Sequence, residues 1–126
     1  MAGLTFDAGA LIAAERGDRA FWTLWKEAIR RDADVTVPSA VVAQVYRGPR
    51  SAVISRVLAA CVVEPLDDRR AREVGRLLGT ARASDVIDAT VIASAASRGD
   101  AIVTSDPGDI GAIAEHARRA GRIIAI

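Results

Sequence analysis

The chain has 126 residues, enough for one folded domain with a sizeable core, so we expect a single domain over residues 1–126. Its composition, 51% hydrophobic and 26% charged, is that of a globular protein and excludes a disordered chain. A net charge of +1 gives the molecule no strong overall attraction for nucleic acid, so any such binding depends on local clusters of cations.

Cys61 is the only cysteine, which excludes an intramolecular disulfide and a zinc site built from thiolates. Its apolar neighbours predict a thiol buried in the core. No apolar run approaches the length that a membrane-spanning helix needs, and the N-terminus lacks the basic start of a signal peptide. We therefore expect a cytoplasmic protein without membrane contact.

In the first half of the chain, short apolar runs alternate with amphipathic segments. Strands are predicted at 4–6, 34–37 and 61–63, and helices at 8–15, 18–31 (capped by Asp18), 40–47 (capped by Ser39) and from 51 to about 58. In the second helix, Phe21, Trp22, Trp25 and Ile29 recur at helical spacing, which predicts core packing. Trp22 and Trp25 also suit a partner-binding surface, because tryptophan is enriched in interface hot spots.

The second half of the chain continues the alternation. We predict a helix opening at 65–68, a linker at 79–84, a central apolar helix from Asp85 to about residue 98, a strand at 101–104, a helix at 110–119 and a strand at 123–125. Strands that alternate with helices indicate parallel pairing and a sheet covered on both faces. The fold class is therefore α/β, on a mainly parallel five-stranded sheet.

Acidic residues fall at the edges of these elements. Asp7 ends the first strand, Asp106 and Asp109 follow the fourth, and Asp85 and Asp88 begin the central helix. If the first and fourth strands are neighbours where the strand order reverses, Asp7 and Asp106 face one crevice. The start of the central helix can lean over it.

Such a cluster suits a hard divalent cation, because Mg²⁺ takes oxygen ligands and keeps several waters. The helix N-cap is the simpler interpretation for Asp85, and Asp109 is equally well explained as a turn or cap residue. Asp88 lies among apolar residues, and no basic residue is near Asp7 in the sequence. These two acids are therefore harder to explain as structural.

Several segments together resemble the PIN domain, and most closely the VapC-type toxins of bacterial toxin–antitoxin pairs. The matching segments are 6–12, 37–38, 88–95 and 103–110, in the family's order over nearly the whole chain. The resemblance implies a three-layer α/β/α sandwich that acts as a Mg²⁺- or Mn²⁺-dependent ribonuclease. It also implies a homodimer that a VapB-type antitoxin holds silent.

The resemblance assigns the metal-binding and catalytic acids to Asp7, Asp88 and Asp106, with Asp109 as a supplementary acid. Gln44 stands where the family commonly has a glutamate, and an amide carries no charge and cannot act as a base. Loss of that anion should weaken metal binding, and Asp85 could partly offset it. Ala8 also lacks the hydroxyl that many members have beside the first acid.

Two further possibilities remain at this point. The chain could be a binding module that keeps the fold but has lost turnover through Gln44, or a receiver-like or phosphatase-like α/β protein. The latter is disfavoured because a receiver needs a lysine near its C-terminus, and the only lysine is Lys26. For RNA contact, Arg47 and Arg50 are candidate phosphate ligands, although they suit solvated loop charges equally well. His116, the only histidine, is expected at the surface.

Overall fold

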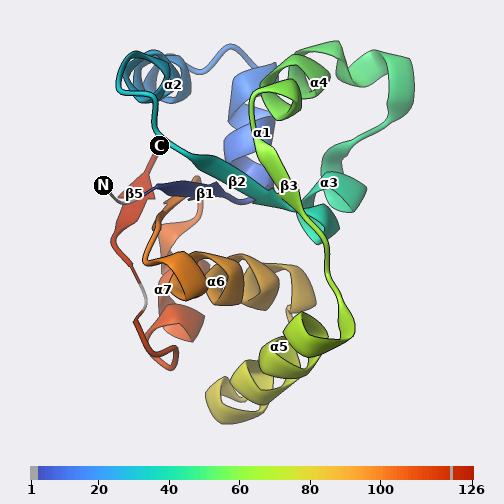
Figure 1. The fold of residues 1–126 in the computed structure, drawn as a ribbon, viewed down its shortest axis with the longest axis vertical. Helices are drawn as coiled ribbons and strands as arrows, with labels where there is room; N and C mark the ends of the chain where they lie inside the picture. Colours follow the sequence, from blue (N-terminus) through green and yellow to red (C-terminus); the bar gives the residue numbers. More distant parts are fainter. Residues whose placement is uncertain (1–2, 120) are drawn as a thin grey trace.

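Five parallel strands form one sheet at the centre of the molecule, in the order β3-β2-β1-β4-β5 (Figure 1). The computed structural model describes residues 3–119 and 121–126. Its strands are β1 (Leu4–Phe6), β2 (Val35–Pro38), β3 (Val62–Glu64), β4 (Ala101–Thr104) and β5 (Ile123–Ala125). From β1 the order proceeds to β2 and β3 on one side and to β4 and β5 on the other, so the reversal lies between β1 and β4. Ligands of open parallel sheets bind at such a reversal.

Helices cover both faces of this sheet, which confirms the predicted three-layer sandwich (Figure 1). On one face lie α1 (Ala8–Glu15), α2 (Arg19–Arg30) and α4 (Ala52–Ala59), and on the other lie α5 (Asp68–Ala81), α6 (Val86–Arg98) and α7 (Pro107–Ala114). The short α3 (Ser39–Val45) follows the carboxyl end of β2 and continues into a 3₁₀ turn, η1 (Gly48–Ser51). None of the helices in the described part of the chain combines the length and apolarity needed to cross a membrane.

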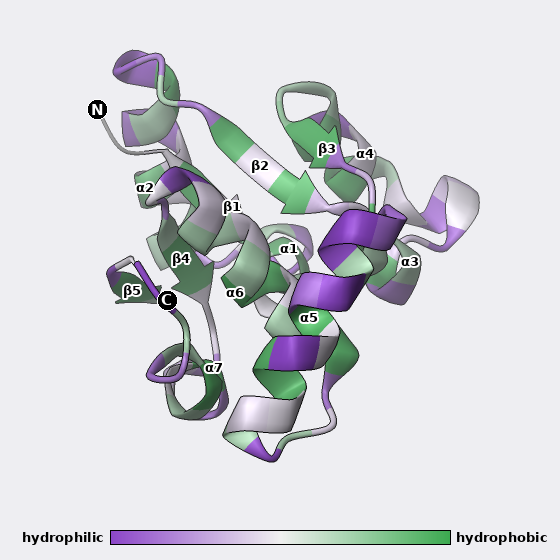
Figure 2. Ribbon diagram, turned by 60° about the horizontal axis from the view of Figure 1, so that its bottom comes forward, coloured by the Kyte–Doolittle hydropathy of each residue, from purple (hydrophilic) through white to green (hydrophobic). Residues whose placement is uncertain are grey.

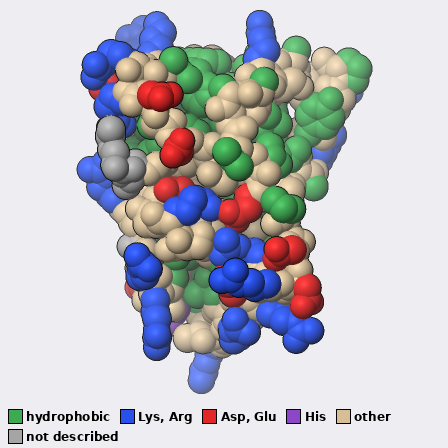
Figure 3. Space-filling view, in the orientation of Figure 1, with side chains coloured by type: hydrophobic (Ala, Val, Ile, Leu, Met, Phe, Trp, Pro, Cys, Tyr) green, Lys and Arg blue, Asp and Glu red, His purple; other side chains and the backbone are tan. Residues whose placement is uncertain are grey.

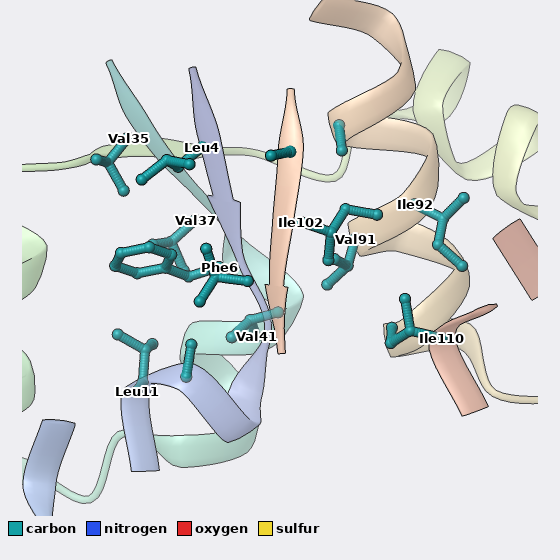
Figure 4. Packing of buried hydrophobic residues seen from close by; sticks show 14 of the residues in the cluster. Leu4, Phe6, Leu11, Val35, Val37, Val41, Val91, Ile92, Ile102 and Ile110 are labelled. Carbon is teal, nitrogen blue, oxygen red and sulfur yellow. The ribbon is translucent and has the colours of Figure 1, made fainter. Parts of the chain in front are cut away.

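The core lies on both sides of β1, β2 and β4, which are buried along their whole length. Leu4 and Phe6 pack towards α1, whereas Ile102 points towards Val91 of α6 (Figure 4). The apolar character of α6 extends around the helix because the sheet, α5 and α7 all pack against it (Figure 2). Burial of each large side chain in this cluster contributes about 1.5–3 kcal/mol. The core thus fixes α6, and with it the acidic residues at its start.

Three helices differ in their bounds from the prediction. Helix α3 spans Ser39–Val45 instead of 40–47, so Arg47 lies beyond its end. Helix α5 continues through Ala81, so the segment predicted as a linker from Gly79 is partly helical. Helix α7 spans Pro107–Ala114 instead of 110–119, because Asp106 caps it and a proline occupies its first position, where the missing N–H is not needed.

Three side chains are also placed differently from the prediction. Ser39 does not cap its helix: it is the first helical residue, and its hydroxyl accepts the Leu66 N–H at 3.1 Å, which fastens α3 to the segment after β3. Ile29 is 53% exposed and does not pack in the core. Cys61 is half-buried instead of buried, and desolvation raises the pKa of its thiol to about 11. His116 is exposed, as predicted.

Candidate active site

The carboxylates singled out by the sequence meet at the carboxyl ends of β1 and β4. The two strands are neighbours, and the Asp7 N–H donates to the Val103 carbonyl at 3.2 Å, which extends their pairing by one residue. The charges of Asp7, Asp85, Asp106 and Asp109 all raise the pKa of Asp88. Residues from three separated segments of the chain therefore interact at one place, as expected if the first and fourth strands are neighbours.

Three helix N-termini converge on this cluster. Asp7, Asp85 and Asp106 are the N-caps of α1, α6 and α7, and each accepts the N–H three residues on, at 2.9, 2.9 and 3.5 Å. This confirms the cap interpretation of Asp85 and shows that the same local role belongs to Asp7 and Asp106. Each cap hydrogen bond uses one carboxylate oxygen, Oδ1, so the other oxygen of each group is not needed for capping.

The other two acids stand at the third position of their helices, one turn after a capping aspartate. Burial and then the Asp85 charge are the largest causes that raise the pKa of Asp88 to about 6. The pKa of Asp109 is also raised, first by a side-chain hydrogen bond with Asp106 and then by the charge of Asp106.

No arginine or lysine of the described residues forms a salt bridge with any of these acids. The positive ends of three helix dipoles offset part of the charge, each by roughly 0.3–1 kcal/mol for an exposed anion. That compensation is incomplete: burial and then neighbouring carboxylate charges raise the pKa values of Asp7 and Asp88, and a hydrogen bond with Asp106 and then the Asp106 charge raise the pKa of Asp109. The cluster therefore retains mutual repulsion that a bound cation would relieve.

Thr104, the last residue of β4, is a site residue that the sequence reasoning missed. Its hydroxyl is fully buried, donates a hydrogen bond to the Asp7 carboxylate and accepts the Asp106 N–H at 2.9 Å. One hydroxyl thus joins the acid of β1 to the acid after β4. The signal in the sequence was a hydroxyl residue two positions before Asp106, in Thr104-Ser105-Asp106.

Gly9, in the first turn of α1, packs against the turn that carries Asp106. A Cβ at Gly9 would come within 2.1 Å of the Ser105 hydroxyl oxygen and 3.1 Å of its Cβ. A glycine is needed here because the start of α1 and the β4–α7 turn approach each other closely. This contact sets the start of α1, which Asp7 caps, against the turn that carries Asp106.

The profile of the PIN domain family matches residues 4–115. This chain belongs to the PIN domain family. Among curated proteins, no relative matches it.

Several solved structures share the fold at low sequence identity. VapBC2 from Rickettsia felis bound to a promoter DNA fragment is 9% identical, with 98% of each chain covered and a TM-score of 0.73. DNA-bound VapBC from Salmonella typhimurium is 16% identical over 99% of this chain and 98% of the other, with a TM-score of 0.72. FitAcB from Neisseria gonorrhoeae is 15% identical over 96% of each chain, with a TM-score of 0.68.

The predicted supporting residue Gln44 and the two predicted phosphate ligands of this PIN domain lie on α3 and just beyond it. Gln44 is exposed on α3, a helix that contacts α6. Arg47 folds back on the end of α3, where its guanidinium donates to the carbonyl oxygens of Ala43 and Tyr46 at 3.3 and 2.8 Å. Arg50 is exposed in η1.

The donor set of this PIN domain fits a hard divalent cation, although the described residues hold no group of three or more His, Cys, Asp or Glu side chains already close enough to ligate one. All five clustered acids offer oxygen only, and a bound cation would offset both the burial and the neighbouring carboxylate charges that raise the pKa of Asp88. Mg²⁺ usually keeps several waters and takes few protein carboxylates, so a complete protein cage is not required.

Proposed function

We propose that this PIN domain is a metal-dependent endoribonuclease of the VapC type, neutralised by a VapB-type antitoxin. The observation that carries the proposal is the convergence of five carboxylates on three helix N-termini without a protein cation. Burial first, and then the charges of the other four acids, raise the pKa of Asp88 to about 6. The family supports nuclease chemistry, and the VapBC-like fold supports the toxin class.

In this proposal Asp7, Asp88 and Asp106, with Asp109, hold Mg²⁺ or Mn²⁺. When bound, such an ion supplies an activated water and stabilises charge on the phosphodiester oxygens. Asp88 must give up its proton before it can bind a metal, so affinity should rise with pH through about 6. Asp85 and Gln44 are supporting residues, and we assign neither of them as a metal ligand or a catalytic group.

The protein's own contribution is the placement of these oxygens. The N-cap hydrogen bonds hold Asp7, Asp85 and Asp106 at their helix starts. The Thr104 hydroxyl orients Asp7 relative to Asp106. Arg50, exposed and free of any salt bridge within the described residues, is the better of the two predicted phosphate ligands, since Arg47 already binds backbone carbonyls.

The test is RNA cleavage by the purified chain with Mg²⁺, compared with Asp7→Asn and with Asp68→Asn as a matched control. Asparagine caps a helix as well as aspartate, so Asp7→Asn should keep the fold while cleavage falls at least about a hundredfold. Asp68 is exposed at the start of α5, in a surface ion pair with Arg72, so Asp68→Asn should not change RNA cleavage. Cleavage by Asp7→Asn at the wild-type rate, or in the presence of a chelator, would refute the proposal.

We also propose that the antitoxin occupies a groove of about 510 Å³ between α1, α2 and α4. Trp22 and Trp25 line it beside Val53 and Val57, and both tryptophans are only partly buried. Trp25→Glu should weaken antitoxin binding at least tenfold in calorimetry without loss of RNA cleavage. A toxin of this class is expected to be a homodimer, which sedimentation of the isolated chain would test.

A second candidate function is RNA or protein binding without turnover. The exposed Gln44 on α3 and the lack of a ready-made ligand group among the described residues favour it. Gln44→Glu separates the two functions. If this variant cleaves RNA and the wild-type chain does not, the binding function is correct for the natural sequence.

A further inference from the structure

A basic groove lies on the side of the sheet that α1 does not cover, between α5, α6 and the turn at 115–119. Its volume is about 560 Å³. Four arginines and the single histidine line it, from both sides: Arg69, Arg76, His116, Arg118 and Arg119. Lysine and arginine side chains also gather on the lower half of the face in Figure 3, the half that holds α5 in Figure 1.

Most of this positive charge has no counterion. Glu73 is the only acid among the lining residues, and Arg70 already pairs with it at 2.8 Å and Arg69 at 3.5 Å. No salt bridge within the described residues involves Arg76, Arg118 or Arg119. Like charges that face one another across a groove are destabilising unless an anion enters.

The groove extends away from the acidic cluster. Both α6 and α7 begin at that cluster, and the groove runs along α6 beside the segment that follows α7. Ala93 and Ser97, which line it, are five and nine residues after Asp88, so they lie roughly 8 and 14 Å along the helix axis. Small residues on α6 leave room for a ligand to approach the helix closely.

We propose that this groove binds the phosphates of the RNA strand outside the cleavage site. Arginine suits the task because its planar guanidinium binds phosphate oxygens in bidentate fashion. The lining contains no Phe, Tyr or Trp, and its polar side chains are mostly arginines that bind phosphate, so contact there should depend little on base sequence. The proposal rests on the proposed function and extends it from the reaction centre to the path of the substrate.

The test is the salt dependence of binding to a fluorescent single-stranded RNA, measured by anisotropy in EDTA so that no cleavage occurs. Arg76→Gln combined with Arg118→Gln removes one cation from each side of the groove. Because each phosphate contact on a single strand contributes about 0.7 to the slope of log K against log salt, the slope should fall in magnitude by about 1.4. Affinity at 0.1 M salt should then fall about 10- to 25-fold.

The matched control is Arg30→Gln with Arg72→Gln, which removes the same charge from exposed surface ion pairs outside the groove. It should change the slope by less than half as much. An unchanged slope in the groove variant, an equal loss in the control, or no RNA binding by the wild-type chain would each overturn the proposal. So would a groove variant that keeps RNA binding and loses binding of a polyglutamate peptide, which would indicate an acidic protein ligand. Because EDTA prevents turnover, these outcomes do not depend on whether the chain cleaves RNA.

Discussion

Two regions of this PIN domain contain a buried carboxylate, and only one of them pairs it with an arginine. At the amino end of β4, Asp100 is 3% exposed and accepts hydrogen bonds from Arg98 Nε at 2.9 Å and from the Thr5 hydroxyl at 2.8 Å. At the carboxyl end of β1, Asp7 is 6% exposed and has a hydroxyl and backbone N–H groups as partners, but no arginine.

The two carboxylates differ because arginines surround Asp100, whereas other carboxylates surround Asp7. Arg98 of α6 also donates to Glu64 and to the Ser94 hydroxyl. Arg70 of α5 pairs with Glu64 at 3.2 Å and donates to the Ser97 hydroxyl at 3.2 Å. Arginines from two helices therefore complete the network around Asp100 and Glu64. The acidic cluster has carboxylates where this network has guanidinium groups. Complete pairing is typical of a structural site, whereas clustered carboxylates without a paired arginine or lysine at the sheet's reversal point are typical of a functional site.

The comparison is tested most strongly by Arg98→Met, which leaves the buried Asp100 and the half-buried Glu64 without that partner. Removing one member of a buried ion pair leaves an uncompensated charge, and we expect about 3 kcal/mol of lost stability in urea unfolding. Arg72→Met on exposed α5 breaks a surface pair and should cost under about 0.5 kcal/mol. Equal losses in the two variants would show that the Arg98 network stabilises the fold no more than a surface ion pair does.

Thr104→Val removes the hydroxyl that joins the two strand-end acids while keeping the shape of the side chain. We expect about 1–2 kcal/mol of lost stability, because the buried Asp7 carboxylate and the Asp106 N–H each lose a hydrogen-bond partner. The pKa of Asp7, already raised by burial, should rise further, as a carboxyl-carbon NMR titration would measure. Exposed Thr23→Val is the control, and an unaltered Asp7 titration would contradict the role assigned to Thr104.

The sequence predicted the elements well because their signals are local. Apolar runs predicted all five strands to within a residue at either end, and Asp18 and Asp85 were recognised as helix caps. The sequence also brought Asp7 and Asp106 together, since parallel strands end at the same edge of a sheet. Local patterns suffice where one side chain and its own backbone decide the outcome.

What the sequence did not predict depends on partners distant along the chain. Ser39 looked like a cap, but its hydroxyl binds an N–H 27 residues away. Thr5 looked like an ordinary strand residue, but its hydroxyl donates to Asp100, 95 residues later. The partners of Thr104 likewise become visible only when β1 lies beside β4. Side-chain hydrogen bonds across elements leave no periodic trace in the sequence.

The smallest expected effect concerns Asp88 and the sign of its contribution to stability. Its pKa in the folded state is about 6, above the ordinary value of 3.8, so the folded state holds the proton more tightly than the unfolded state does. The resulting penalty is absent below about pH 4, develops as pH rises, and is complete above about pH 6. Asp88→Asn should therefore leave stability unchanged at pH 4 and increase it at pH 7.5. The increase should be about 1 kcal/mol after allowance for solvent screening of this partly exposed group.

Urea unfolding at the two pH values measures this difference, with Asp68→Asn as the exposed control that should change nothing at either. Addition of Mg²⁺ at pH 7.5 sharpens the result, because a ligand that binds only the folded state stabilises it by mass action. The wild-type chain should gain stability from Mg²⁺ and the Asp88→Asn variant should gain less, so the advantage of the variant should shrink or reverse. A variant that is less stable than the wild type at pH 7.5 without metal would show that the cluster is compensated after all, and the contrast with the Asp100 network would fail.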